Sequence, residues 1–131
     1  MNYKISTWFC RLYLAILCFH IVYKAYVNSI TTDEAYTYLE YVYTRDVFNI
    51  GVANNHILNT FSMFLTTFLG ETEIFLRLPN VVAGLGYLLT VLVISQNNQF
   101  KILTVVVLTS PVYLIEYFTL ARGYGISSFL I

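Results

Sequence analysis

Several ionisable side chains of this sequence stand beside long apolar segments. They comprise two adjacent carboxylates, an imidazole, two guanidiniums and a glutamate within an apolar run: Asp33, Glu34, His56, Arg77, Arg122 and Glu116. A carboxylate can act as general base toward a hydroxyl or an amine. Arginine and protonated histidine can hold a phosphate, arginine through paired hydrogen bonds. Because a phosphate leaving group needs its charge neutralised in the transition state, this set suits transfer from a phosphate-linked donor.

The first three of these residues also have ordinary structural roles that the sequence leaves open. The run Thr31-Thr32-Asp33 is typical of a helix start, so Asp33 can be a helix cap rather than a base. Glu34 then falls in the first turn, where a negative charge favours the helix dipole. His56 can simply begin the next helix. These alternatives stand beside the catalytic interpretation.

The remaining polar residues also have structural alternatives. Arg77 can anchor a span at the membrane interface, and Arg122 can extend its charged end toward water. Glu116 is harder to explain, because it lies inside an apolar run. His20 and Lys24 are expected to serve helix packing or to reach the interface. No histidine, cysteine or carboxylate spacing forms a metal motif, so no cofactor is certain, and a divalent metal is possible but not indicated by the spacing.

The composition predicts the environment of these residues. Of 131 residues, 58% are apolar and 11% are charged, and the mean hydropathy is +0.68. Soluble domains carry about 25% charged residues, and a chain this short cannot hide so much apolar surface by folding alone. The sequence therefore predicts an integral membrane protein with lipid as its solvent. The zero net charge gives no indication of a nucleic-acid partner.

The predicted fold class is all-α, with polytopic transmembrane helices. Spans are expected over about 8–27, 74–95 and 102–118, with a further one starting at residue 121. The first segment has about 20 residues, enough to cross a bilayer, so we interpret it as a retained helix and not a cleaved signal. Small residues in the second span favour close helix packing, namely Ala83, Gly84 and Gly86.

Two shorter helices are expected to lie along the membrane surface in the first outer loop. Residues 34–45 place apolar side chains at helical spacing on one face. Residues 57–69 are too short to span, since a span needs about 20 residues, and they carry several polar side chains. With Lys4 and Arg11 cytoplasmic, Asp33, His56 and Arg122 then share the extracytoplasmic face.

An ordered series of short motifs resembles a known family. The series is Thr32-Asp33-Glu34-Ala35, Asn54-Asn55-His56, Leu69-Gly70-Glu71-Thr72-Glu73, Leu76-Arg77-Leu78-Pro79-Asn80, Ser110-Pro111 and Ala121-Arg122-Gly123-Tyr124. It resembles the N-terminal part of the GT-C glycosyltransferases of the protein-mannosyltransferase and aminoarabinose-transferase type. The resemblance covers roughly residues 8–131, and its strength lies in the order of the motifs because each one alone is weak.

The resemblance implies an enzyme of the cell (inner) membrane that takes sugar from a polyprenyl-phosphate donor on the extracytoplasmic side. By position, Asp33 matches the proposed catalytic base and Glu34 its acidic neighbour. His56 and Arg122 match positions near the donor phosphate. Glu116 and Arg77 are possible supporting residues, and the sugar acceptor stays unknown.

The chain departs from the family pattern in two positions and in length. Ile57 stands where a proline usually follows the histidine, and Leu120 stands where an acidic residue often precedes the Ala-Arg pair. Family members are considerably longer, so we expect this chain to correspond to the N-terminal part of such a module. The alternative is a small non-enzymatic membrane protein that acts as an assembly or transport subunit.

Overall fold

A computed structural model describes residues 3–49, 56–96 and 99–131, and within them every regular element is helical. In chain order, the elements are α1 (Tyr3–Val27), α2 (Thr32–Thr37), the π-helix η1 (Tyr38–Val42), α3 (Ile57–Thr67), α4 (Glu73–Gln96), α5 (Lys101–Thr109), α6 (Val112–Tyr117) and α7 (Gly123–Leu130). The predicted all-α class is confirmed for these residues. The motif residues Asn54 and Asn55 lie outside the described residues.

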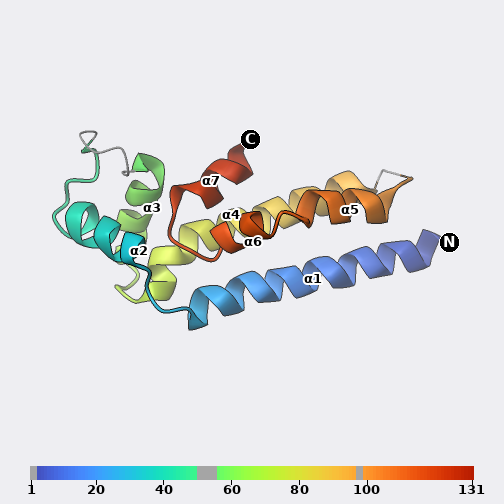
Figure 1. The fold of residues 1–131 in the computed structure, drawn as a ribbon, viewed down its shortest axis with the longest axis horizontal. Helices are drawn as coiled ribbons and strands as arrows, with labels where there is room; N and C mark the ends of the chain where they lie inside the picture. Colours follow the sequence, from blue (N-terminus) through green and yellow to red (C-terminus); the bar gives the residue numbers. More distant parts are fainter. Residues whose placement is uncertain (1–2, 50–55, 97–98) are drawn as a thin grey trace.

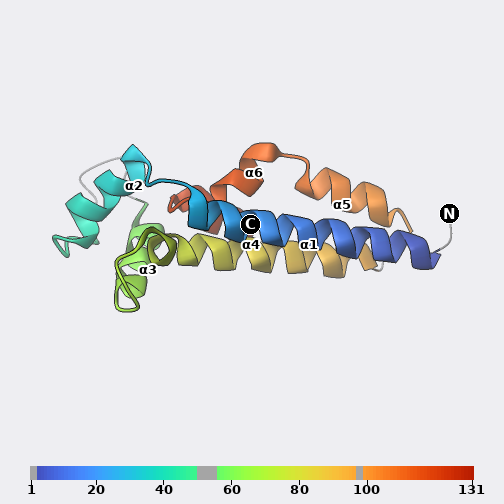
Figure 2. The ribbon, with the colours of Figure 1, turned by 90° about the horizontal axis from the view of Figure 1, so that it is seen from below.

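Helices α1 and α4 form the long axis of the molecule and lie side by side, with α5 along both (Figures 1 and 2). Two segments, Ile5–Val27 and Glu73–Gln96, are long and apolar enough to cross a membrane. Many of their outward-facing side chains are apolar and exposed, among them Trp8, Phe19 and Leu89. Such surfaces are unfavourable in water and favourable in lipid.

Small residues allow the long helices to approach closely. A Cβ on Gly84 would lie 2.7 Å from the Cβ of Phe118 and 3.2 Å from Cδ1 of Ile21. Both of these neighbours are fully buried, so a side chain at residue 84 would push α4 away from α1 and α6. The predicted packing role of Ala83 and Gly84 is confirmed, since both are buried in this core.

The segment predicted as one helix over 102–118 is interrupted. Helix α5 ends at Thr109, and α6 begins at Val112 after Pro111, whose ψ of 99° is extended. Proline has no N–H for the helix and disfavours helical geometry in the residue before it. The expectation of one continuous helix is therefore wrong, although α5 and α6 both pack against α1.

The polar end of the molecule lies away from the N-terminus, where α2, η1 and α3 gather (Figure 1). Helix α3 runs across the direction of α4, and α7 folds back along α4 from this end (Figures 1 and 2). The predicted helix over 34–45 is present in part, as α2 and η1, and it ends at Val42, with a turn over residues 43–45. The wider turn of the π-helix rotates the buried face, so Tyr41 is buried while Leu39 is exposed.

Candidate functional site

A capping box starts α2 and places the two candidate carboxylates. Thr31 is the N-cap, its hydroxyl accepts from the N–H of Glu34, and Oε2 of Glu34 accepts from the N–H of Thr31 at 2.8 Å. Asp33 is therefore not the cap. Successive residues on a helix point about 100° apart, so Asp33 faces outward and Glu34 faces the core.

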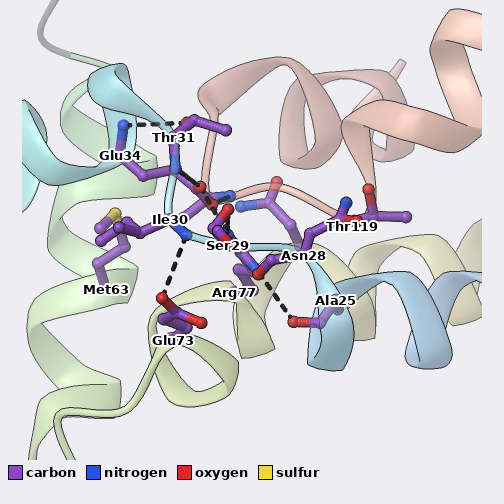
Figure 3. Close-up of polar contacts among 12 residues, drawn as sticks. Ala25, Asn28, Ser29, Ile30, Thr31, Glu34, Met63, Glu73, Arg77 and Thr119 are labelled. Carbon is purple, nitrogen blue, oxygen red and sulfur yellow. Dashed lines mark hydrogen bonds and ion pairs between the residues drawn. The ribbon is translucent and has the colours of Figure 1, made fainter.

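Glu34 forms a buried ion pair with Arg77 of α4 (Figure 3). Nε and Nη2 of Arg77 donate to the two carboxylate oxygens at 2.8 Å each, and both side chains are 1% exposed. This is the paired, bidentate geometry that makes an arginine–carboxylate contact strong. It joins the first polar segment to the second long helix.

The rest of the Arg77 guanidinium binds the end of α1. Nη1 donates to the carbonyl oxygens of Ala25 at 3.0 Å and Asn28 at 2.6 Å, and Nη2 donates to that of Ser29 at 3.0 Å (Figure 3). The last carbonyls of a helix have no partners within the helix, so this cation satisfies them. Arg77 lies near the start of α4, as an anchor at the start of a span would, but its charge points into the fold and not toward solvent.

Glu34 also holds the segment that follows α6. Its Oε1 accepts from the N–H of Ala121 at 2.7 Å. Burial acts to raise the pKa of Glu34, but the hydrogen bonds from Arg77, Ala121 and Thr31 outweigh it and leave this pKa below its usual value. Glu34 is thus a charged carboxylate whose oxygens are occupied by the fold, which suits a positioning residue rather than a base.

The neighbouring Asp33 lines a small cavity together with His56 and Arg122. The cavity measures about 120 Å³, and its lining is Asp33, Tyr36, Thr37, His56, Asn59, Ala121, Arg122 and Tyr124. Pockets for whole small molecules are usually about 300–1,000 Å³. The space therefore suits a phosphate-sized group, with the rest of any ligand lying outside. Three residues from three distant parts of the sequence meet here.

Arg122 supplies the guanidinium of this cavity. Its Nη2 forms an ion pair with Oδ2 of Asp33, whose side chain is 66% exposed. The Nε of Arg122 is buried and has no hydrogen-bond partner among the described residues. An unsatisfied buried donor costs free energy until an acceptor reaches it, so the arginine has capacity for a further anion.

His56 immediately precedes α3 and makes no side-chain capping bond. Its ring lies edge-on to Tyr124 at 5.0 Å between centroids, and Tyr124 lies 5.0 Å from Tyr117. The aromatic contact holds the imidazole beside Arg122, where a protonated ring would add positive charge.

Two buried asparagines support the cavity and were missed by the sequence interpretation. Nδ2 of Asn80 donates to Oδ1 of Asn59 at 2.7 Å, and Nδ2 of Asn59 donates to the carbonyl oxygen of Ala121 at 3.0 Å. Oδ1 of Asn80 accepts from the N–H of Ile126 at 3.2 Å. Each amide side chain lies inside an apolar segment of the sequence. Because buried polar groups are normally paired, these two positions could have been predicted to bind one another or a backbone group.

Glu116 lies apart from the cavity lining and faces α1. Its carboxylate lies 3.6 Å from Nε2 of His20 and 3.8 Å from Nζ of Lys24. The polar residues of the first long helix therefore meet the unexplained glutamate of α6. Glu116 thus contributes to helix association in this arrangement.

Gly123 controls the position of His56, which gives a testable prediction. A Cβ at residue 123 would lie 2.5 Å from the Cβ of His56. We expect Gly123→Ala to displace the imidazole and lower the free energy of unfolding by about 1–3 kcal/mol, as overpacking does. Thermal unfolding in detergent, with the NMR shift of the His56 ring, measures both effects.

Gly86→Ala is the matched control for this substitution. There the new methyl group meets the outer end of the Phe129 ring at 2.9 Å, and that ring is exposed and can move. Its stability change should stay within about 0.5 kcal/mol. If both alanine variants leave the His56 signal in place, Gly123 has no role in positioning that ring.

The chain matches no protein-family model, no curated protein and no solved structure in the three comparisons. Within the described part of the chain, no group of three or more histidine, cysteine, aspartate or glutamate residues could hold a metal ion. The geometry of the cavity around Asp33 is therefore the main indication of function.

Proposed function

We propose that the chain acts in glycosyl transfer from a polyprenyl-phosphate-linked sugar. The observation that carries this proposal is the convergence of Asp33, His56 and Arg122 on one phosphate-sized cavity. The cavity lies at the end of two helices that are long and apolar enough to span a membrane. A lipid-carried donor presents its phosphate at that level of a bilayer.

The chemistry assigns a separate task to each residue. Arg122 and a ring N–H of His56 bind the phosphate and stabilise the charge that develops as the sugar leaves. Asp33 accepts the proton of the acceptor hydroxyl or amine. Asp33 is paired with Arg122 in the structure, so the donor phosphate must replace Asp33 on Arg122 before Asp33 can receive a proton. The unpartnered Nε of Arg122 supports this exchange.

The proposed membrane arrangement follows the positions of the helices. We place the N-terminus in the cytoplasm, with α1 and α4 spanning the cell membrane and α2 and α3 at its extracytoplasmic surface. The basic residue Arg11 lies toward the N-terminal end of α1, whereas Asp33 follows its other end. The transverse direction of α3 supports a surface position (Figure 1).

Binding of a radiolabelled polyprenyl phosphate to the full chain in lipid nanodiscs tests this proposal. We expect Arg122→Gln and His56→Gln each to weaken binding by about tenfold, because the first removes a positive charge and the second removes the ring that donates to the phosphate. Arg11→Gln, which changes an exposed arginine of α1 outside the cavity, should leave binding unchanged. Equal retention of the corresponding polyprenol, which lacks the phosphate, would argue against the proposed site.

The second candidate is a non-enzymatic membrane subunit that assembles with another protein. The exposed apolar faces of α1 and α4 favour it, because such faces can meet another helix as well as lipid. This alternative predicts that the binding of polyprenyl phosphate is independent of Arg122.

A further inference from the structure

A second cavity lies at the same end of the molecule, between η1 and α3. It measures about 350 Å³, within the usual range for small-ligand sites. Its lining is Tyr38, Val42, Tyr43, Arg45, Phe64, Thr67, Phe68 and Glu71. None of these residues lines the cavity around Asp33. The second cavity is thus a separate site.

The charges in this cavity are opposite and unpaired. Neither the guanidinium of Arg45 nor the carboxylate of Glu71 forms an ion pair within 4.0 Å in the described part of the chain. Arg45 also has a φ of 62°, a left-handed conformation that non-glycine residues rarely adopt outside constrained positions. Arg45 and Glu71 are both exposed residues that line the cavity, so each charge is accessible to a ligand.

The remaining walls are aromatic. Tyr38 and Tyr43 have ring centroids 6.4 Å apart, and Phe64 meets Phe68 edge-on at 5.4 Å. Burial raises the pKa of Tyr38 and the nearby Glu71 carboxylate adds to that effect, which places this charge beside the aromatic wall. Aromatic faces and a carboxylate together attract an ammonium group.

The rim of the cavity indicates a lipid rather than a soluble ligand. Two of the lining residues, Tyr43 and Phe68, are 72% and 75% exposed, and Leu69, next to Phe68 in the sequence, is 65% exposed. In water this surface contributes nothing to binding a small zwitterion. At a membrane interface it would contact acyl chains, and tyrosine is suited to that depth.

We propose that this cavity binds the headgroup of an aminophospholipid of the phosphatidylethanolamine type. Arg45 holds the lipid phosphate, Glu71 accepts hydrogen bonds from the primary ammonium, and the tyrosine and phenylalanine rings enclose it. The bound lipid fixes η1 and α3 at the bilayer surface. The site requires membrane association, and it does not depend on glycosyl transfer.

Native mass spectrometry of the full chain released from detergent tests the site. The probes are phosphatidylethanolamine and phosphatidylglycerol with the same acyl chains. We expect Glu71→Gln to reduce retention of phosphatidylethanolamine by about fivefold and to leave phosphatidylglycerol unchanged, because only the first lipid carries an ammonium. Arg45→Gln should reduce both lipids, since both carry a phosphate.

Asp46→Asn is the matched control, because Asp46 is an exposed acid on the turn after η1 that does not line the cavity. It should retain both lipids like the native chain. Soluble phosphoethanolamine, which lacks acyl chains, should not displace the lipid at equal concentration. Displacement by it, equal retention of the two lipids by the native chain, or undiminished phosphatidylethanolamine in the Arg45→Gln/Glu71→Gln double variant would overturn the proposal.

Discussion

Replacing Arg77 with methionine is expected to lower the free energy of unfolding by about 3–5 kcal/mol, the usual cost of breaking a buried ion pair. The substitution keeps an unbranched side chain but leaves the Glu34 carboxylate buried without its cation. It also frees the carbonyl oxygens of Ala25, Asn28 and Ser29. Since small folds are stable by only about 5–15 kcal/mol, the variant should be close to unfolding. Denaturant titration in detergent, followed by circular dichroism, measures the change.

Two controls separate the ion pair from a general effect of losing arginine. Arg11→Met changes an exposed arginine of α1 and should shift stability by less than about 0.5 kcal/mol. Glu34→Gln combined with Arg77→Met removes both charges and should cost less than the sum of the single changes. An Arg77→Met protein as stable as Arg11→Met would show that the buried pair contributes nothing to the fold.

Asp33→Asn is expected to reduce sugar transfer by about 10²–10⁴-fold, the usual contribution of a general base. The amide cannot accept the proton of the acceptor, yet it has the shape of the carboxylate. Because the Asp33 side chain is 66% exposed, stability should change little. The measurement is release of polyprenyl phosphate from vesicles supplied with a panel of labelled polyprenyl-phosphate sugars.

The binding and transfer measurements together define the role of Asp33. Donor binding should survive in Asp33→Asn, because Arg122 loses a competing anion and gains access to the phosphate. Asp46→Asn, in an exposed acid outside the cavity, should transfer sugar at the native rate. Native rates in Asp33→Asn would eliminate Asp33 as the base, even if the phosphate site is real.

The long helices and the start of α2 were predictable because their signals are local. A run of about 20 apolar residues specifies a span-length helix without reference to any other part of the chain. Thr31 and Glu34 form a capping box whose two members are three residues apart. Small residues in α4 likewise predicted close helix packing, and of the two glycines in α4, Gly84 is approached more closely by its neighbours.

The break at Pro111 could also have been predicted from the local sequence, because a proline in the middle of a proposed helix favours an interruption. Other features could not be obtained in this way. No pattern in the sequence around Glu34 predicts that its partner is Arg77, which lies 43 residues later. Asp33 and Glu34 are adjacent in the sequence, which does not show which of them faces the core. The packing of α2 against the rest of the fold decides that Asp33 points outward and Glu34 inward.

The cavity was predicted in part. Helix lengths and the number of crossings placed Asp33, His56 and Arg122 on one face, and the structure brings all three to the lining of one cavity. Their support depends on contacts that no local pattern encodes, such as the hydrogen bond between Asn59 and Asn80. The rotation introduced by η1 likewise arises from a single wider turn.

The adjacent acids of α2 hold adjacent residues of a much later segment, and this has a consequence for biosynthesis. Asp33 binds Arg122, and Glu34 binds the N–H of Ala121, which lies 87 positions further along the chain. While the ribosome is still making the intervening helices, Glu34 can already pair with Arg77, but the cavity lacks its arginine. The segment that carries Asp33 and Glu34 therefore completes its contacts late in translation, after the segment containing residue 122 has left the ribosome. A nascent chain stalled before that point should expose α2 to proteases that the finished protein resists.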